Sequence, residues 1–375
     1  MFFPAQIQEQ TNPTENKLEI AFTHIKALDG LRAVAVLIVM FHHLDLLIPD
    51  KKEFFKAGYL GVDVFFVLSG FLITSVLLKE HSKFENINLK NFFLRRTLRL
   101  IPAYWFFLAV LYVFGNYLLV PDSAAFIYGY NNFFWAFFYL TNWHRIISDG
   151  TVTGNLNHTW SLSIEEQFYI FWSLVLFLAF REKKTRPQVF GIALGITVVL
   201  IFWQLFRAIT KTEFDTIYYS TDLRMDAIMI GCVLSFLYYW KLIPQGFTDS
   251  MKFKMMSLAS LITSIFILFN FAYGDMTLFY GFKSLFSINI AVIILWLITQ
   301  KNHFIVKLLE TRLLCWIGTI SYPLYLWHYL CYETGRKYFD SVSLQIIFGL
   351  SISFIIASFS YYLIEKPFLR LKHKF

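Results

Sequence analysis

The sequence is poor in charged residues and in cysteine. Charged side chains make up only 15% of the 375 residues, against 57% hydrophobic and 20% aromatic side chains. One soluble core could not bury so much apolar surface, which excludes an ordinary soluble protein. The three cysteines, Cys232, Cys315 and Cys331, lack the spacing of metal ligands. Neither a metal site nor a disulfide framework is therefore expected.

The N-terminus also lacks the features of a signal peptide. Residues 1–26 contain no apolar core followed by a small-residue cleavage site. We expect a cytoplasmic N-terminal segment, 1–26, and a single transmembrane domain, 27–375, with a short cytoplasmic tail. The net charge of +8 comes from short Lys and Arg clusters between apolar runs, without interleaved aromatic residues. These charges indicate orientation against membrane lipid, and no nucleic-acid partner is expected.

Long apolar runs recur along the whole chain. Each is close to the length, about 20 residues, that a helix needs to cross a bilayer, and helices satisfy their own backbone groups in lipid. The sequence predicts ten spans, near 28–48, 59–78, 100–120, 162–180, 188–208, 222–240, 255–273, 280–300, 313–332 and 343–364. The predicted fold class is an all-α integral membrane protein, a bundle of about ten transmembrane helices.

The aromatic segment 124–143 is an eleventh candidate span, but three asparagines interrupt it. If it does not cross, most Lys and Arg between the spans lie on the side of the N-terminus, as expected for cytoplasmic loops. We therefore predict that both termini are cytoplasmic and that 124–143 is an interfacial or re-entrant outer segment. The abundance of Lys, Asn, Ile and Phe resembles AT-rich bacterial usage, so the expected location is a bacterial inner membrane.

Ionisable residues inside predicted spans are costly and indicate a partner or a function. The first span carries Arg32 and His43, 11 residues apart. On an ideal helix they share one face, about 20° from alignment, and lie about 16 Å apart along the axis. Arg32 would then lie near the cytoplasmic side and His43 in the outer half. The alternative is that Arg32 extends to lipid headgroups and His43 makes a polar contact between helices.

A basic cluster precedes the third span. Arg96 and Arg99 lie on one face at helical spacing. Guanidinium groups bind phosphate oxygens in a bidentate way, so a polyphosphate ligand such as coenzyme A would fit here. A signal for orientation against anionic lipid explains the cluster equally well.

Further polar groups lie in or beside later spans. Glu165 and Glu166 are adjacent near the start of the fourth span, where one can interact with the helix dipole and the other can orient a histidine or bind acceptor hydroxyls. Arg224 and Asp226 open the sixth span, where internal salt bridges are the expected role. The candidates for lining a cavity or binding the acceptor are Trp160, Tyr169, Arg224, Asp226, Tyr322 and His328.

Taken together, these motifs resemble the membrane acyltransferase-3 family. The resemblance rests on LDGLRA at 28–33, the spacing from Arg32 to His43, GVDVFFVLSGF at 61–71, Arg96 with Arg99, WSL at 160–162, EEQFY at 165–169, and SYP at 321–323 with His328. It covers almost the whole chain. Another acyltransferase pattern, the His-Asp dyad of soluble glycerolipid enzymes, matches His24 and Asp29, but no accompanying motif follows.

The resemblance implies an enzyme that transfers an acyl group, most often acetyl, from cytoplasmic acyl-CoA to a hydroxyl of a glycan or glycolipid such as lipopolysaccharide O-antigen or exopolysaccharide. It implies that His43 is catalytic and that Arg32, with Ser69 nearby, holds the donor. Arg96 and Arg99 would contact donor phosphates. By the same resemblance Asp63, with Glu165 or Glu166, would complete the site. Acetyl-CoA would be a substrate, with no permanently bound cofactor.

Several alternatives remain at this point. His43 could act as a general base or accept the acyl group covalently, and Asp63 would stabilise its imidazolium if it lay near enough. A transporter or flippase for a glycan precursor is the competing class, but the halves of the sequence show no internal repeat. Some relatives carry an extra esterase-like domain. We expect this chain to act without one, or with a separate partner.

Overall fold

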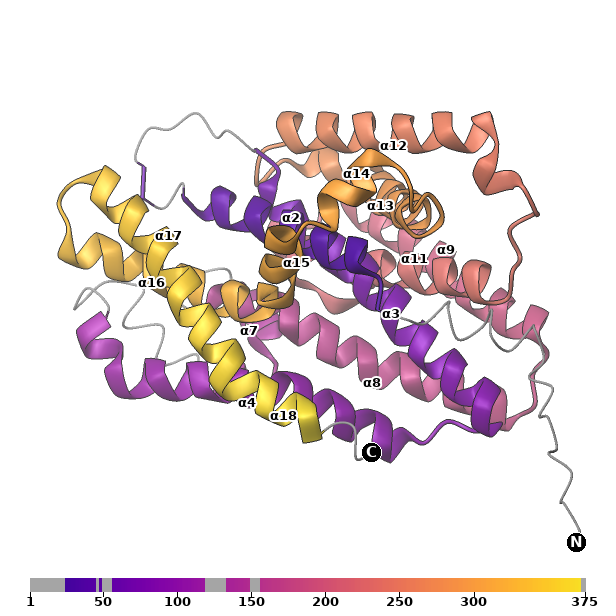
Figure 1. Ribbon diagram of the computed structural model, residues 1–375, viewed down its shortest axis with the longest axis horizontal. Helices are drawn as coiled ribbons and strands as arrows, with labels where there is room; N and C mark the ends of the chain where they lie inside the picture. The colour runs from indigo at the N-terminus through magenta and orange to yellow at the C-terminus, as the bar shows by residue number, and fades with distance from the viewer. Residues whose placement is uncertain (1–23, 45–46, 49–55, 119–132, 149–155, 372–375) are drawn as a thin grey trace, which may run out of the picture.

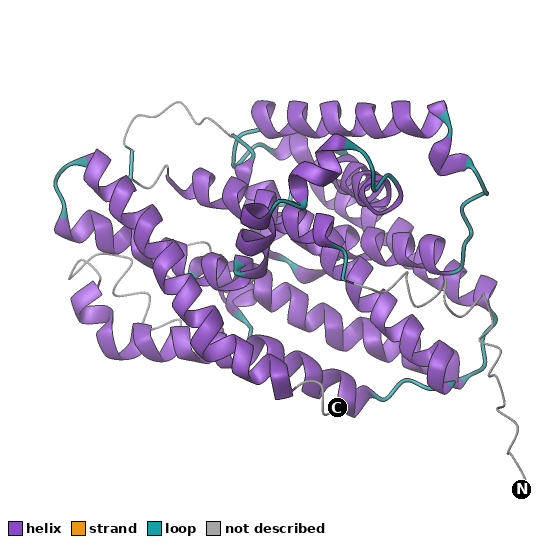
Figure 2. Cartoon of the chain, viewed as in Figure 1, coloured by secondary structure: helices purple, strands orange, loops and turns teal. Residues whose placement is uncertain are grey.

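The computed structural model describes residues 24–44, 47–48, 56–118, 133–148 and 156–371. Every secondary-structure element in these residues is helical, and none of them lies in a strand (Figure 2). The predicted all-α fold class is thus confirmed. Most of the predicted N-terminal segment 1–26 lies outside the described residues.

The helices fall into two groups by length. The long helices are α2 (Lys26–His43), α3 (Gly61–Phe84), α4 (Leu89–Leu118), α8 (Trp160–Arg181), α9 (Arg186–Ile209), α11 (Thr221–Tyr239), α12 (Met251–Asn270), α13 (Phe282–Thr299), α16 (Ser321–Tyr338) and α17 (Val342–Phe359). The short helices are α6 (Phe133–Phe137), α7 (Thr141–Ile147), α10 (Phe214–Tyr219), α14 (Phe304–Leu309), α15 (Arg312–Thr319) and α18 (Lys366–Leu371). A π-helix, Ser360–Glu365, joins α17 to α18.

The long helices form a bundle around α2 and α3. In Figure 1, α12 lies along one edge and α4 along the opposite edge, with α2, α3 and α8 between them. The most extensive contacts are those of α3 with α11, while α2 contacts α3, α15 and α16. α17 pairs with α16, and the π-helix and α18 contact α4. α2 therefore lies between helices that come from distant parts of the sequence.

Seven helical segments of the described chain are long and apolar enough to cross a membrane. They are Gly58–Phe84, Leu89–Gly115, Asn157–Arg181, Arg186–Ile209, Met251–Asn270, Phe282–Thr299 and Val342–Leu371. The predicted count of ten is not confirmed. The other three predicted spans fall on α2, on α11, and on α15 with α16. α2 and α11 each carry three charged residues, which lowers their apolar character.

The ninth predicted span, 313–332, is interrupted in the structure. α15 ends at Thr319 and α16 begins at Ser321. Pro323 lies in the first turn of α16, where its missing N–H is tolerated, but it could not donate a helical hydrogen bond to a continuing α15. The prediction of one continuous helix was wrong, although the proline was visible in the sequence.

The predicted outer segment 124–143 lies partly outside the described residues. Its described part comprises α6 and the beginning of α7. At five and seven residues, both helices are too short to cross a bilayer. The described part of this segment therefore agrees with the prediction that 124–143 does not cross the membrane as a single helix.

The contact between α3 and α11 depends on two glycines. A Cβ at Gly70 would collide with the backbone of Ile228, and one at Gly231 would collide with the backbone of Val67. Small residues at such crossings let helix backbones approach closely. This close approach brings the polar residues of α3 and α11 into contact.

Candidate active site

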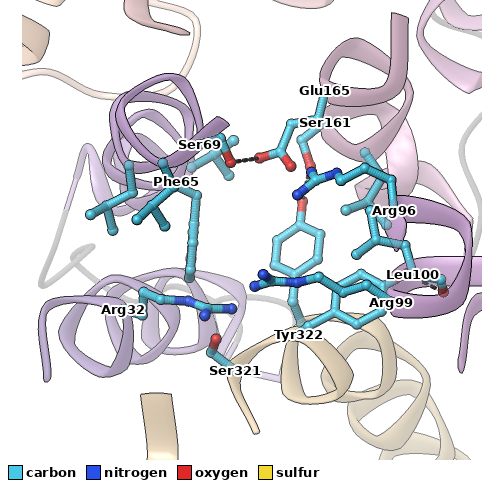
Figure 3. A pocket seen from close by; sticks show the side chains of 15 residues that line it. Arg32, Phe65, Ser69, Arg96, Arg99, Leu100, Ser161, Glu165, Ser321 and Tyr322 are labelled. Atoms are coloured by element: carbon cyan, nitrogen blue, oxygen red, sulfur yellow. Dashed lines mark hydrogen bonds between the residues drawn. The ribbon is translucent and has the colours of Figure 1, made fainter. Parts of the chain in front are cut away.

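Three arginines point into one cavity. The cavity has a volume of about 100 Å³, and its walls include Arg32 of α2 together with Arg96 and Arg99 of α4. Figure 3 shows their guanidinium groups directed into the same space. We call this the arginine cavity. The sequence placed these three residues in two separate motifs, and the structure brings them together.

Arg96 is positioned by the ring of Tyr169 in α8. The guanidinium carbon lies 3.8 Å from the ring centroid, a favourable cation–π geometry. The buried Nε of Arg96 has no hydrogen-bond partner among the described residues. Because guanidinium groups bind phosphate and carboxylate oxygens, this arrangement can hold an anionic ligand.

Among the described residues, one carboxylate lines this cavity together with the arginines. Glu165 accepts a hydrogen bond from the Ser69 hydroxyl at 3.2 Å (Figure 3). It also accepts one from the Tyr169 hydroxyl at 2.7 Å. The hydroxyl of Tyr322, also in the wall, donates to the carbonyl of Leu100 at 3.0 Å. Glu165 therefore bonds to hydroxyl groups, and among the described residues it orients no histidine.

A second cavity adjoins the first and shares Arg32, Arg99 and Tyr322 with it. It has a volume of about 380 Å³, and its wall includes the carboxyl groups of Asp29 and Glu365. His24 Nε2 lies 2.6 Å from Asp29 Oδ2, so the His-Asp pair noted in the sequence does form. It forms in the wall of this second cavity. Together the two cavities make a larger space on one side of α2.

His43 lies at the other end of α2, in contact with His328 of α16. His43 Nδ1 is 2.9 Å from His328 Nε2, and the ring centroids are 5.0 Å apart. His328 is fully buried, and the ring of Tyr329 lies edge-on to His43 at 5.6 Å. We call His43 and His328 the histidine pair. Arg32 and His43, predicted to act together, are about 16 Å apart along one helix.

Asp63 does not contact His43 but belongs to a buried ion cluster. Its Oδ2 accepts a bond of 2.8 Å from Arg224 Nη2, and its Oδ1 lies 4.0 Å from Lys283 Nζ. Lys283 also pairs with Asp226, and all four side chains are fully buried. The sequence left a contact of Asp63 with the imidazolium of His43 conditional on their proximity, and in the structure Asp63 pairs with Arg224 and Lys283 instead. Arg224 and Asp226 make salt bridges as predicted, each with a residue of another helix.

The remaining predicted residues lie near these groups. Trp160 is buried, and its ring centroid lies 5.3 Å from the guanidinium carbon of Arg224, beside the ion cluster. Glu166 is absent from the wall of the arginine cavity, and its buried Oε1 has no hydrogen-bond partner among the described residues. The two adjacent glutamates thus have different surroundings.

Sequence analysis missed two residues of these clusters. Lys283 lies inside the predicted span 280–300, and a charged residue within a span is the same signal that identified Asp63. His158 stacks on Tyr329 with ring centroids 5.6 Å apart, and its Nε2 lies 3.1 Å from the carbonyl of Leu326. Its only signal in the sequence was its place in the polar run directly before α8, which begins at Trp160.

Comparison with known proteins places the chain in a family. Residues 25–364 match the model of the acyltransferase domain of the acyltransferase-3 family. A Staphylococcus aureus (strain COL) protein whose name proposes an O-acetyltransferase is 33% identical over 92% of this chain and 57% of its own length. The peptidoglycan O-acetyltransferase OatA of Listeria monocytogenes is 31% identical over 92% of this chain and 56% of its own length.

A Bacillus subtilis protein whose name proposes a peptidoglycan O-acetyltransferase is 32% identical over 92% of this chain and 55% of its own length. The chain thus spans about half the length of these relatives. No solved structure matches it. The predicted resemblance is confirmed, as is an integral membrane protein with several long apolar helices. The family match covers most of the helix bundle, including both ends of α2, and this chain belongs to the acyltransferase-3 family.

Proposed function

We propose that this protein is a membrane O-acetyltransferase that moves an acetyl group from acetyl-CoA to a hydroxyl of a glycan outside the cell. The observation that carries the proposal is the arrangement along α2. The arginine cavity lies at one end of this helix and the histidine pair at the other. A site for an anionic donor and a basic group about 16 Å away on the same helix match the two halves of a transfer reaction.

In this proposal the donor enters from the cytoplasm and its phosphates bind Arg32, Arg96 and Arg99. Three half-buried arginines face one carboxylate in the arginine cavity, whereas Asp29 and Glu365 lie in the wall of the adjoining cavity, so phosphate oxygens fit best in the arginine cavity. The smaller arginine cavity suits part of the donor, and the adjoining second cavity extends the space. Both termini are then cytoplasmic, in a bacterial inner membrane, as the distribution of Lys and Arg predicts.

The chemistry is assigned to His43. In direct transfer, the acceptor oxygen bonds to the thioester carbonyl carbon while the imidazole takes the hydroxyl proton, and the C–S bond then breaks. The proton finally passes to the leaving thiolate, so the products are the acetyl ester and coenzyme A. In the covalent scheme, the imidazole nitrogen bonds to the thioester carbonyl carbon and the C–S bond breaks, releasing the thiolate. The acceptor oxygen then takes the acetyl group as the C–N bond breaks, and its proton passes through the imidazole to the thiolate. Both schemes need a ring nitrogen with a free electron pair.

The acceptor is proposed to be a sugar hydroxyl of peptidoglycan. The names of the Listeria and Bacillus relatives favour peptidoglycan over the lipopolysaccharide or exopolysaccharide suggested by the sequence motifs alone. Aromatic rings beside the histidine pair suit contact with sugar rings. The ring of Tyr329, which is only partly buried, lies 5.6 Å from that of His43.

The proposal is tested by measuring acetyl esters on extracted surface glycans. Cells that lack their own O-acetyltransferases would express the wild type, His43→Ala or His303→Ala, with matched protein levels in the membrane. His303 is an exposed residue of the α14 N-terminus and controls for loss of a histidine. We expect ester on peptidoglycan with the wild type and His303→Ala only. Equal esterification by His43→Ala would remove His43 from the chemistry, and ester on another glycan would change the acceptor.

A further inference from the structure

The hydrogen bonds of His328 determine which of its nitrogens carries the hydrogen. His328 Nδ1 lies 3.1 Å from the carbonyl oxygen of Leu324, one turn earlier in α16. A carbonyl oxygen only accepts hydrogen bonds, so Nδ1 of His328 must donate. A neutral imidazole has one N–H, and Nε2 of His328 is therefore an acceptor.

The same reasoning extends to His43. Its Nδ1 lies 2.9 Å from His328 Nε2, so Nδ1 of His43 must supply the hydrogen of this bond. The remaining nitrogen, Nε2 of His43, then carries the free electron pair. We propose that His328 is a positioning residue that holds His43 in the Nδ1–H tautomer and thereby makes Nε2 the reactive nitrogen. The role of this nitrogen rests on the proposed function, whereas the hydrogen-bond chain does not.

Contacts of Tyr332 hold the rings of His43 and His328 in position relative to each other. The Tyr332 hydroxyl, one turn further along α16, donates to the carbonyl of Met40 at 3.2 Å and so connects α16 to α2 beside His43. The Tyr332 ring also lies edge-on to His328, with centroids 5.8 Å apart. A hydrogen bond separate from the histidine pair thus fixes the relative position of the two helices at this level.

The chain differs from the usual arrangement in which a carboxylate orients a catalytic histidine. Within the part of the chain that the structure describes, no carboxylate forms an ion pair with His43 or His328. The backbone carbonyl of Leu324 takes the place of the carboxylate and acts through His328. Hydrogen bonds from His43 to His328 and from His328 to this carbonyl fix the tautomer of His43 without adding a charged carboxylate to the bundle.

The tautomer can be measured directly, without any assay of activity. The full-length protein with 15N-labelled histidine, reconstituted in lipid nanodiscs, would be studied by NMR, and the His43 signals would be assigned by comparison with His43→Ala. We expect a protonated Nδ1 and an unprotonated Nε2 for His43. A protonated Nε2 in the wild type would overturn the proposal, whether or not the protein transfers acetyl groups.

Two variants of His328 separate positioning from packing. The amide of Gln reaches about as far as Nε2 of histidine and can accept from His43, whereas the shorter Asn reaches only about as far as Nδ1. With acetyl-CoA as donor and peptidoglycan fragments as acceptor, we expect His328→Asn to lower kcat about 10- to 100-fold with little change in KM for acetyl-CoA. We expect His328→Gln to recover most of the rate and to keep Nδ1 of His43 protonated.

The outcomes distinguish the two proposals. Equal kcat values for His328→Asn and His328→Gln, in folded protein, would overturn the positioning role. If the expected tautomer is found but His43→Ala transfers acetyl groups as fast as the wild type, the proposed function of His43 fails while the hydrogen-bond chain stands. The tautomer measurement on the wild type remains decisive even if a His328 variant does not fold.

Discussion

The ion cluster and the arginine cavity contain the same kinds of side chain in opposite arrangements. In the ion cluster, Arg224 and Lys283 face Asp63 and Asp226, and all four side chains are fully buried. In the arginine cavity, three arginines at intermediate burial share space with one carboxylate. One group balances its charges within direct ion pairs, and the other directs three guanidinium groups and one carboxylate into a cavity.

This difference separates a structural role from a binding role. A buried charge without a partner is costly, so a balanced cluster connects the helices that supply its members, here α3, α11 and α13. A group with unbalanced charge gains from a ligand of opposite sign. The arginines of the cavity are therefore placed to bind an anionic ligand, such as the proposed donor, whereas Arg224 pairs with Asp63.

The largest expected effect comes from unbalancing the ion cluster. Asp63→Ala would leave Arg224 buried without its carboxylate, and we expect a loss of about 3–5 kcal/mol in the free energy of unfolding. Thermal unfolding of purified protein in one detergent would measure this loss as a lowered midpoint. Arg32→Ala, in the arginine cavity, should leave the midpoint nearly unchanged because it removes a charge that has no ion pair among the described residues.

The double variant Asp63→Leu with Arg224→Met provides the control. It removes both charges of the pair, and replacing a buried ion pair by apolar residues is often neutral. We expect it to unfold at a higher temperature than Asp63→Ala. If Asp63→Ala unfolds at the same temperature as the wild type, the ion cluster does not stabilise the bundle and the comparison with the arginine cavity fails.

The next largest effect is expected from neighbouring arginines of α4. Arg96 points into the arginine cavity, whereas Arg95 pairs with Glu80 at 2.5 Å. Bonds to charged groups contribute about 1.5–3 kcal/mol, so Arg96→Ala should raise KM for acetyl-CoA about 10- to 100-fold. Arg95→Ala should change it far less, since partly exposed ion pairs contribute about 1 kcal/mol or less.

Arg96→Lys sharpens this comparison. Lysine keeps the positive charge but lacks the planar fork of a guanidinium, and we expect a KM between those of the wild type and Arg96→Ala. Steady-state kinetics with varied acetyl-CoA would give all four values. Similar increases for Arg95→Ala and Arg96→Ala would indicate a general effect of charge near the membrane surface, and not a specific site.

The sequence was sufficient for properties that depend on one helix at a time. Apolar length predicted most helices, and helical periodicity placed Arg32 and His43 on one face of α2. Apolar length alone failed where polarity interrupts a helix. α2 and α11 carry charged residues that contact other helices, and Pro323 lies where α15 ends and α16 begins. These three predicted spans are therefore not among the seven apolar segments, and the count of ten is not confirmed.

Contacts between helices could not be derived from the sequence. Asp63 lies in α3, 161 residues from its partner Arg224, and His328 lies 285 residues from His43. Periodicity gives the face of each side chain but not the helix that it meets. The family resemblance therefore placed Asp63 in the site without giving its partner, and the close approach of α3 and α11 at Gly70 and Gly231 brings it to Arg224.

The smallest effect on donor binding is expected at Glu165. Like the carboxylates of the ion cluster, Glu165 already has partners within the protein. Ser69→Ala removes the 3.2 Å bond to Glu165 but leaves the 2.7 Å bond from Tyr169. One neutral donor contributes about 0.5–1.5 kcal/mol, so the change in kcat/KM for acetyl-CoA should stay below about tenfold. Ser235→Ala is the matched control, since the buried Ser235 hydroxyl bonds to Ser75 across the α3–α11 contact and lines neither cavity. A loss with Ser69→Ala as large as that with Arg96→Ala would mean that the hydroxyl contacts the donor itself, because loss of one of two bonds to Glu165 cannot equal loss of a cationic ligand.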